Sequence, residues 1–241
     1  MLLFGIIFIV IVCGAVFFLV NPPAGYVPSE SKKTPLGPSP IITEKDLTAS
    51  QILKTPQFYL LWIIFFIGAG AGLMIIGGIS GMAKQSMGDM AFIAVAIMAI
   101  GNASGRIVAG IMSDKIGKIT TLFIILVFQA LLMFVSIPVI GSNPSAVVIV
   151  LIATFIGFNY GTNLSLFPSF TKSFWGMKNF GVNFGILMSA WGLGGSIFSR
   201  MSQSLYASSG NYNQPFVIAG ISLIVCMILL GVLKKINAKS V

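Results

Sequence analysis

Arg106 is an isolated cation inside a glycine-rich apolar run, in a chain of which only 8% of the residues are charged. Asn102 precedes it by four residues, so on an α-helix the two polar side chains lie on one face. A guanidinium within a membrane is costly, and it occurs where it faces protein, water or an anion. Its planar fork matches a carboxylate with two parallel hydrogen bonds. The pair predicts an anion-binding site; the alternative is a structural arginine, or one that extends to the membrane surface.

No aspartate or glutamate occurs within the apolar runs of the sequence, so Arg106 has no acidic partner there. An acid from polypeptide outside this sequence is an alternative partner. The same lack of acids argues against proton coupling through a membrane carboxylate in this part of the protein.

The segment at residues 110–118, GIMSDKIGK, has the composition of a short turn between two helices. Asp114 lies at a helix end, Gly117 closes the reversal, and Lys115 and Lys118 mark the cytoplasmic side. The positive N-terminal end of a neighbouring helix can stabilise an acid. Asp114 is therefore a candidate conformational latch, and a solvated tight turn is the alternative.

Polar and aromatic residues interrupt two later apolar runs. They are Asn159, Tyr160 and Asn163 in one run and Asn183, Ser189 and Trp191 in the other. Trp191 lies too deep in its run for the aromatic belt at a membrane surface. Such side chains either line a substrate path or form hydrogen bonds between helices, which contribute about 0.6 kcal/mol on average. Tyr160, Asn163 and Trp191 are our candidates for the wall of the site at Arg106.

Membrane helices are the elements that must position these residues. The 241-residue sequence is 56% hydrophobic, with no histidine and five acidic residues, and its mean hydropathy is +1.01. A soluble domain is nearer a quarter charged, so most of this surface faces lipid. The net charge of +9 does not indicate nucleic-acid binding, because the basic residues cluster between the apolar runs and act there as topology signals.

The sequence predicts neither a metal site nor a cofactor. It has no histidine and only two cysteines, which lie in apolar runs where a thiol behaves as a small hydrophobe. The GAGAG at residues 68–72 lacks the GxGxxG spacing of a dinucleotide-binding loop.

Seven apolar runs are long enough for membrane helices, which need about 20 mostly apolar residues. They cover about residues 2–20, 58–82, 90–112, 119–140, 146–170, 181–206 and 215–233. We therefore predict an all-α membrane protein. Its parts are a first transmembrane helix (1–20), a cytoplasmic linker (21–57) with a short amphipathic helix within residues 43–56, a six-helix bundle (58–233) and a cytoplasmic tail (234–241).

The distribution of basic residues predicts the orientation in the membrane. Eleven of the 14 lysines and arginines fall in segments on one side, and only Lys84 and Arg200 belong to the other. The positive-inside rule places the eleven in the cytoplasm. The C-terminus is then cytoplasmic and, with seven crossings, the N-terminus is outside.

Glycines four residues apart predict close contacts between helices, because small residues let backbones approach in lipid. These pairs are Gly68/Gly72, Gly77/Gly81, Gly101/Gly105, Gly157/Gly161 and Gly181/Gly185.

Residues 110–118 resemble the loop signature of the major facilitator superfamily, GxxxD[RK]xG[RK]. Its fixed positions are occupied by Gly110, Asp114, Lys115, Gly117 and Lys118. Four longer phrases, NPPAGYVP, TPQFYLLWIIFFIGAGAGLMIIG, GNASGRIVAGIMSDKIG and KNFGVNFGILMSAWGLGG, together resemble the oxalate/formate antiporter family of monocarboxylate-type facilitators. The resemblance covers essentially the whole chain. It implies that the seven spans correspond to helices 6–12 of a twelve-helix carrier, so that residues 21–57 join its two halves.

The resemblance also implies a function. Such a protein is not an enzyme but a secondary transporter, a facilitator or antiporter, that moves small carboxylates across the plasma membrane by alternating access. The arginine at the position of Arg106 binds the substrate carboxylate, and the acid at the position of Asp114 stabilises the outward-facing state against a helix end. Oxalate-specific members carry a lysine where this sequence has Trp191, and a single cation suits a monocarboxylate better than a dianion.

The expected partners are a small carboxylate anion, the lipid bilayer and an N-terminal transporter half. The sequence begins directly in a predicted span, without the first five helices of such a carrier, whose site lies between two halves. The alternative is a membrane protein that does not transport, either a truncated remnant or a partner-binding subunit.

Overall fold

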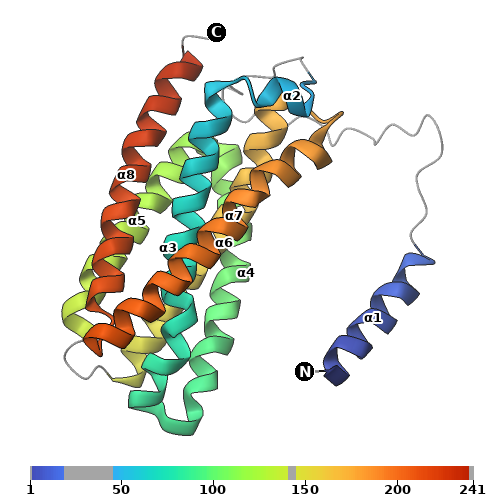
Figure 1. Ribbon diagram of the computed structural model, residues 1–241. Helices are drawn as coiled ribbons and strands as arrows, with labels where there is room; N and C mark the ends of the chain where they lie inside the picture. The colour runs from blue at the N-terminus through green and yellow to red at the C-terminus, as the bar shows by residue number, and fades with distance from the viewer. Residues whose placement is uncertain (1, 19–45, 141–144, 239–241) are drawn as a thin grey trace. The chain divides into compact units, whose positions relative to one another are not determined.

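The computed structural model describes residues 2–18, 46–140 and 145–238. It divides into two units, Met1–Pro35 and Leu36–Val241. The described residues form α-helices joined by short turns and one 3₁₀ turn, and no strand occurs among them (Figure 1). This confirms the predicted all-α fold.

The first unit contains helix α1, Leu2–Val16. Its sequence, LLFGIIFIVIVCGAV, is apolar on every side, as expected for a helix surrounded by lipid. With 15 residues α1 measures about 22 Å, which is shorter than the span predicted for residues 2–20. The end of that predicted span and most of the predicted linker lie outside the described residues.

The described residues of the second unit form a short helix, six long helices and the 3₁₀ turn η1. Their bounds are α2 Ala49–Ile52, α3 Pro56–Met87, η1 Gly88–Ala91, α4 Phe92–Ile116, α5 Lys118–Ile140, α6 Ala146–Trp175, α7 Phe180–Ser209 and α8 Asn213–Ala238. Within the part of the chain that the structure describes, five helical stretches are long and apolar enough to cross a membrane, and the first of them, Pro56–Ile116, contains both α3 and α4. Because η1 reverses the chain between these two helices (Figure 1), the six spans predicted within residues 58–233 correspond to α3–α8.

Several helices extend beyond the apolar runs that predicted them. α3 has 32 residues, and α6 and α7 have 30 each, which gives lengths of about 45–48 Å. The hydrocarbon core of a bilayer is about 30 Å thick, so these helices tilt or continue into the surface layer. The predicted ends were too early because polar residues such as Lys84 and Ser208 continue a helix beyond its apolar part.

The surface helix predicted within residues 43–56 is shorter than expected. α2 has only four residues, and residues 43–45 are not described. Thr48 precedes α2, and its N–H donates to Oε1 of Gln51 at 2.8 Å, as in a capping box. Pro56 then begins α3 at a helix position that tolerates proline because no backbone hydrogen bond is lost there.

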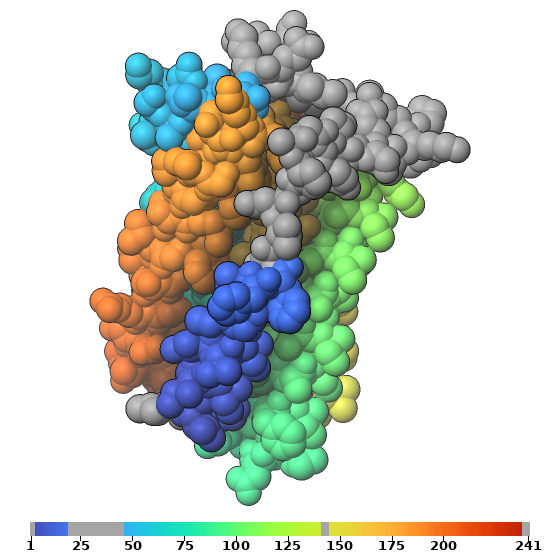
Figure 2. Space-filling model, turned by 90° about the vertical axis from the view of Figure 1, so that its right-hand side faces the viewer, coloured from blue at the N-terminus to red at the C-terminus, as the bar shows by residue number. Residues whose placement is uncertain are grey.

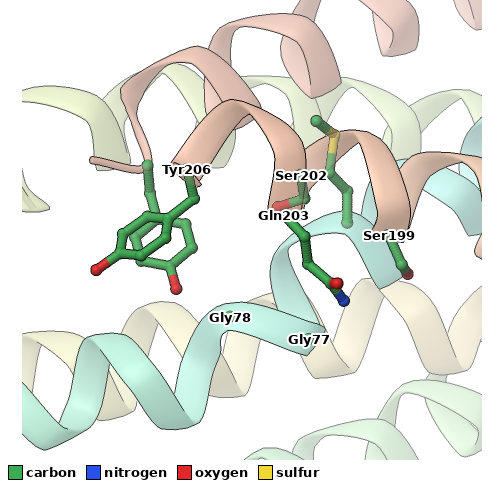
Figure 3. A pocket seen from close by; sticks show the side chains of 8 residues that line it. Gly77, Gly78, Ser199, Ser202, Gln203 and Tyr206 are labelled. Atoms are coloured by element: carbon green, nitrogen blue, oxygen red, sulfur yellow. The ribbon is translucent and has the colours of Figure 1, made fainter. Parts of the chain in front are cut away.

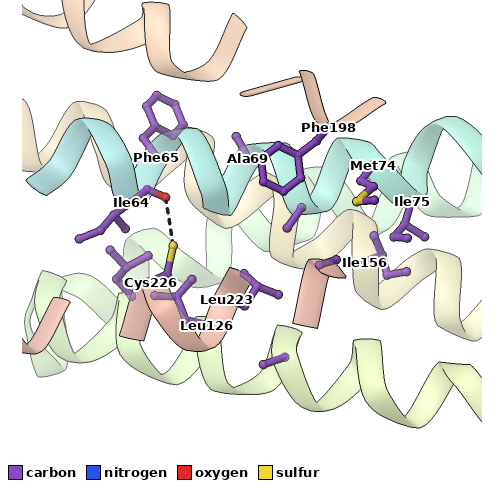
Figure 4. Packing of buried hydrophobic residues seen from close by; sticks show 14 of the residues in the cluster. Ile64, Phe65, Ala69, Met74, Ile75, Leu126, Ile156, Phe198, Leu223 and Cys226 are labelled. Atoms are coloured by element: carbon purple, nitrogen blue, oxygen red, sulfur yellow. Dashed lines mark hydrogen bonds between the residues drawn. The ribbon is translucent and has the colours of Figure 1, made fainter. Parts of the chain in front are cut away.

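The six long helices pack mainly in pairs. The largest contacts join α4 to α6, α3 to α7 and α5 to α8, and α3 also contacts α6 and α8. The core around α3 is apolar: Phe65 stacks on Phe167 of α6 with ring centroids 3.9 Å apart. The buried Cys226 thiol of α8 donates to the carbonyl oxygen of Ile64 at 3.6 Å (Figure 4). Cys226 is thus a small core residue, as predicted.

Successive long helices of the second unit run in opposite directions (Figure 1). The region around α2, the α4–α5 turn, the α6–α7 turn and the end of α8 therefore meet at one end of the bundle. The described lysines that were assigned to the cytoplasm belong to these segments: Lys54, Lys115, Lys118, Lys172, Lys178, Lys234 and Lys235. This end is strongly basic, and its placement in the cytoplasm stays a prediction.

Candidate anion-binding site

A glycine-lined crossing of α4 and α6 positions the predicted site residues. A Cβ added to Gly105 would collide with the carbonyl oxygen of Phe158. The other glycines of these two pairs lie against the opposite backbone in the same way: Gly101, Gly157 and Gly161. The close contact predicted for both pairs is therefore confirmed. It holds Arg106, which follows Gly105, beside the part of α6 that contains Tyr160.

Not every predicted glycine pair forms such a contact. A Cβ on Gly72 of α3 would lie 3.2 Å from Cδ2 of Tyr160, so this glycine also packs closely. At Gly181 and Gly185 of α7, in contrast, a Cβ would meet no atom within 4 Å. The contact predicted for these two glycines is not made within the described chain, and they belong to an open face of α7.

Arg106 is exposed on the surface of α4. Its Nε donates a hydrogen bond to Oδ1 of Asn102 at 3.2 Å, as their predicted placement on one helix face requires. The guanidinium forms no ion pair with an acid among the described residues. Since a guanidinium has five N–H donors, its terminal nitrogens are free to bind an anion.

Tyr160 and Trp191 join α6 to α7 beside this arginine. The indole Nε1 of Trp191 donates to the Tyr160 hydroxyl oxygen at 2.7 Å. Tyr160 is 8% exposed, and the guanidinium of Arg106 is close enough to act electrostatically on its hydroxyl. Three helices thus bring together four of the predicted residues: Asn102, Arg106, Tyr160 and Trp191.

Asn163 lies apart from this group, in the contact between α3 and α6. It is 1% exposed, and its Oδ1 lies 3.6 Å from the position of a Cβ on Gly68. Its Nδ2 donates to the carbonyl oxygen of Asn159 at 3.4 Å, a contact within α6 itself. This placement fits helix packing better than a role in the wall of the site.

Trp62 of α3 is a neighbour that the sequence analysis missed. Its Nε1 donates to Oγ of Ser189, two residues before Trp191, at 3.0 Å. The ring of Trp62 stacks on that of Phe66 with centroids 5.5 Å apart. A tryptophan near the start of a span has the same sequence signal as a residue of the interfacial belt. Only the contact between α3 and α7 distinguishes a tryptophan beside the site from a residue of this belt.

The predicted latch segment forms the turn between α4 and α5. Gly117 has a φ of +83°, a conformation that favours glycine because it has no Cβ. Its N–H donates to the carbonyl oxygen of Ser113 at 3.1 Å. The Ser113 hydroxyl in turn donates to the carbonyl oxygen of Gly110 at 2.9 Å. Gly117 therefore terminates α4, as expected for a turn between two helices.

Asp114 is exposed and forms no hydrogen bond or ion pair with another described residue. The negative charge of Asp114 attracts the ammonium group of Lys118, and the positive charge of Lys172 of α6 repels it. Lys115 is exposed next to it. In this structure Asp114 does not contact the N-terminus of a neighbouring helix, so the latch stays a prediction.

The carboxylate that does hold the start of a helix belongs to Asp46, which the sequence analysis missed. Its Oδ1 accepts hydrogen bonds from the backbone N–H groups of Met177, at 2.9 Å, and Lys178, at 3.0 Å, just before α7. A Cβ on Gly176, which has a φ of +82°, would collide with this carboxylate. No local pattern links residue 46 to a turn about 130 positions later.

Leu47 extends the same attachment. Its N–H donates to the carbonyl oxygen of Trp175 at 3.0 Å. Its own carbonyl oxygen accepts from the side-chain amides of Asn179, at 3.2 Å, and Asn183, at 2.9 Å. The segment before α2 is therefore fixed to the α6–α7 turn.

The long apolar helices define a multi-pass membrane protein, and its Arg106 has no acidic partner among the described residues. Residues 1–199 match the family model of the Major Facilitator Superfamily, and the chain belongs to this family. It is 31% identical to an uncharacterized MFS-type transporter of Escherichia coli (strain K12), YhjX, over 69% of this chain and 40% of that protein. It is 28% identical to the oxalate:formate antiporter of Oxalobacter formigenes, over 76% of this chain and 43% of that protein. The chain spans less than half the length of both relatives.

Proposed function

We propose that this chain is the C-terminal half of a secondary transporter, a facilitator or antiporter, that moves small carboxylates, in particular monocarboxylates, by alternating access. One observation carries the proposal: Arg106 is an exposed cation without an acidic partner among the described residues, and it lies beside Tyr160 and Trp191. The relative named as an oxalate:formate antiporter supports carboxylates as the substrate class.

The hydrogen bonds of the site suit a carboxylate. The bond from Arg106 Nε to Asn102 restrains the guanidinium and leaves its outer edge for two parallel bonds to the anion. The Tyr160 oxygen accepts from Trp191, so the tyrosine's own hydrogen is free to be donated to a second acceptor. An anion beside this group would meet donors from α4 and α6.

The charge of the site favours a monoanion. Arg106 is the one cation of this group of four residues, because Trp191 contributes only an indole. A dianion bound here would keep a negative charge that is partly removed from water and unpaired, which is costly.

The open face of α7 supports a second half that completes the site. Gly181, Gly185 and Gly192 fall within about 40° on this helix, and a Cβ on any of them would meet no atom within 4 Å. α4 and α7 contribute much of one face of the second unit (Figure 2). We propose that the other half packs against this face through the small residues.

The proposed cycle assigns a role to the basic end of the bundle. Asp114 would bind a helix end of the other half in one state and be released in the next, which would bias the inward–outward equilibrium. Its exposure and lack of a partner in this structure leave it available for such a contact. The lysines at this end support a cytoplasmic C-terminus, and we propose that the chain lies in the plasma membrane.

Reconstitution tests the proposal. The chain is placed in proteoliposomes alone and together with a matching N-terminal half, and uptake of radiolabelled formate, acetate and oxalate is measured. We expect uptake only by the pair, with formate preferred over oxalate. Arg106→Gln should lower uptake at least tenfold, and Arg106→Lys should retain part of it because the charge remains.

The matched control is Arg200→Gln, which removes another exposed arginine outside the proposed site and should leave uptake unchanged. Equal uptake by the pair with Arg106→Gln would disprove the anion site. An assembled pair that moves none of the three anions would favour the alternative, a partner-binding subunit that does not transport.

A further inference from the structure

A cavity lies between α3 and α7 (Figure 3), and Arg106 is not among the residues that line it. Its volume is about 120 Å³, and its lining includes Gly77 and Gly78 of α3 and Ser199, Ser202, Gln203 and Tyr206 of α7. Sites for drug-sized ligands measure about 300–1,000 Å³. This cavity therefore fits a molecule of only a few heavy atoms.

Ser202 is the buried polar group of the cavity. It is 4% exposed, and its hydroxyl forms no hydrogen bond with the described residues. The hydroxyl is not among the fully buried polar atoms that lack a partner, so it keeps accessible surface in the cavity that it lines and can donate a hydrogen bond to a small molecule there. Figure 3 shows the amide of Gln203 extending from α7 toward Gly77 on the opposite wall.

Two stacked tyrosines close one end of the cavity. The rings of Tyr206 and Tyr212 have centroids 4.4 Å apart and planes 27° apart. Tyr212 lies directly on α3, where a Cβ on Gly78 would come within 2.6 Å of its ring. Burial raises the pKa of the Tyr212 hydroxyl, and a tyrosine hydroxyl is a hydrogen-bond donor at neutral pH even without such a shift.

The cavity lies on the same face of α7 as the candidate anion site. Ser202 follows Trp191 by 11 residues, which corresponds to a rotation of only about 20° and a distance of about 16 Å along the helix. One helix face thus carries a residue of each site.

We infer that this cavity is a transit site. Its neutral donors hold the transported carboxylate on its way between Arg106 and the end of the bundle opposite the basic end. The inference rests on the proposed function. Hydroxyl and amide groups can hydrogen-bond a carboxylate, and none of the described residues that line the cavity is charged. Binding is then weaker than at an arginine, because neutral donors offer the carboxylate hydrogen bonds but no opposite charge, and the anion is released easily.

Direct binding to the full chain in lipid nanodiscs tests the inference. A fluorine label on the Tyr206 ring is observed by ¹⁹F NMR while sodium formate is added, and formamide serves as the uncharged probe of matched size. We expect formate to give a saturable shift of the ¹⁹F resonance. Formamide should need a concentration at least tenfold higher to give the same shift. The same saturable shift should persist in Arg106→Gln, because the two sites are separate.

Two variants remove the site in different ways. Gly77→Leu fills the cavity from a position where a Cβ meets no atom within 4 Å, and it should weaken formate binding at least tenfold. Ser202→Ala deletes the buried donor and should weaken it several-fold. Gly231→Leu is the control, because Gly231 of α8 is equally unobstructed and lies outside the cavity.

The transit site is wrong if formate gives no saturable shift, if formamide binds as well as formate, or if both Gly77→Leu and Ser202→Ala bind normally. Loss of the shift in Arg106→Gln also overturns it, because the label would then report the anion site. The proposed function fails separately, when the assembled pair moves none of the three anions.

Discussion

Gly105 lies directly against the carbonyl oxygen of Phe158, and this contact sets the separation of α4 and α6. Arg106 follows Gly105 on α4, and Tyr160 follows Phe158 by two residues on α6. The position of the guanidinium relative to the phenol therefore depends on the absence of a side chain at residue 105.

Gly105→Ala should separate the two helices and destabilise the bundle by about 1–3 kcal/mol, the usual cost of overpacking. Unfolding of the purified chain in micelles measures this free energy. Gly110→Ala on the same helix is the control, because a Cβ there meets no atom within 4 Å; alanine should be neutral or stabilise the helix by up to about 1 kcal/mol. Equal stability of the two variants would show that the crossing is not tight.

Tyr160→Phe and Trp191→Phe each remove one end of the 2.7 Å hydrogen bond between α6 and α7. A double-mutant cycle of unfolding free energies should give a coupling of about 0.5–1.5 kcal/mol, the net value of such a bond. Tyr160→Phe combined with Trp62→Phe should be additive, because Trp62 bonds to Ser189 instead. A coupling near zero between Tyr160 and Trp191 would mean that this bond does not stabilise the fold.

Asp46→Ala should release the start of α7, because the N–H groups of Met177 and Lys178 lose their shared acceptor. Hydrogen exchange at these two amides should accelerate about fivefold, which corresponds to about 1 kcal/mol for an exposed bond to a carboxylate. The control is Asp89→Ala, since Asp89 is exposed in η1 and far along the chain from this turn. Unchanged exchange at both amides would contradict the attachment.

Trp191→Lys should change the substrate preference of the reconstituted pair. A second cation beside Arg106 would neutralise the second charge of a dianion, so the ratio of oxalate to formate uptake should rise at least tenfold. Trp62→Lys, which adds the same charge on α3, serves for comparison and should raise this ratio less. The explanation of the preference by charge fails if Trp191→Lys transports with the wild-type ratio.

Asp114→Asn keeps the shape of the side chain and removes its charge. If Asp114 is a latch, the maximal transport rate should fall several-fold while the concentration for half-maximal uptake changes little, because the anion site at Arg106 is intact. Asp114→Glu should restore part of the rate. A normal rate in Asp114→Asn would leave the residue in its alternative role, a solvated turn.

The sequence predicted the helices well, because a continuous apolar run in lipid has few other structures available. It also predicted that Asn102 and Arg106 share a face and that Gly101 and Gly105 form a close contact, since both follow from helical periodicity. The ends of the helices were less predictable. A polar residue such as Lys84 does not stop a helix, whereas it does end an apolar run.

What the sequence could not indicate were the partners of side chains across the bundle. Asn163 and Tyr160 lie in the same interrupted run, yet Asn163 turns to Gly68 and Tyr160 turns to Trp191. Three residues on a helix place two side chains only about 60° apart, so periodicity does not separate their partners, and only the placement of α3 and α7 decides what each side chain meets. Asp46 was missed for the same reason, because its partners come from the α6–α7 turn.

The attachment of Asp46 and Leu47 to the α6–α7 turn also has a mechanical meaning. α7 begins at this turn and carries Trp191 and Ser202 along one side. A pull on the chain just before α2 would act on the start of a 30-residue rod, and a small tilt there would move both residues together. The segment before α2 would then transmit force directly to a helix that contributes to both proposed sites.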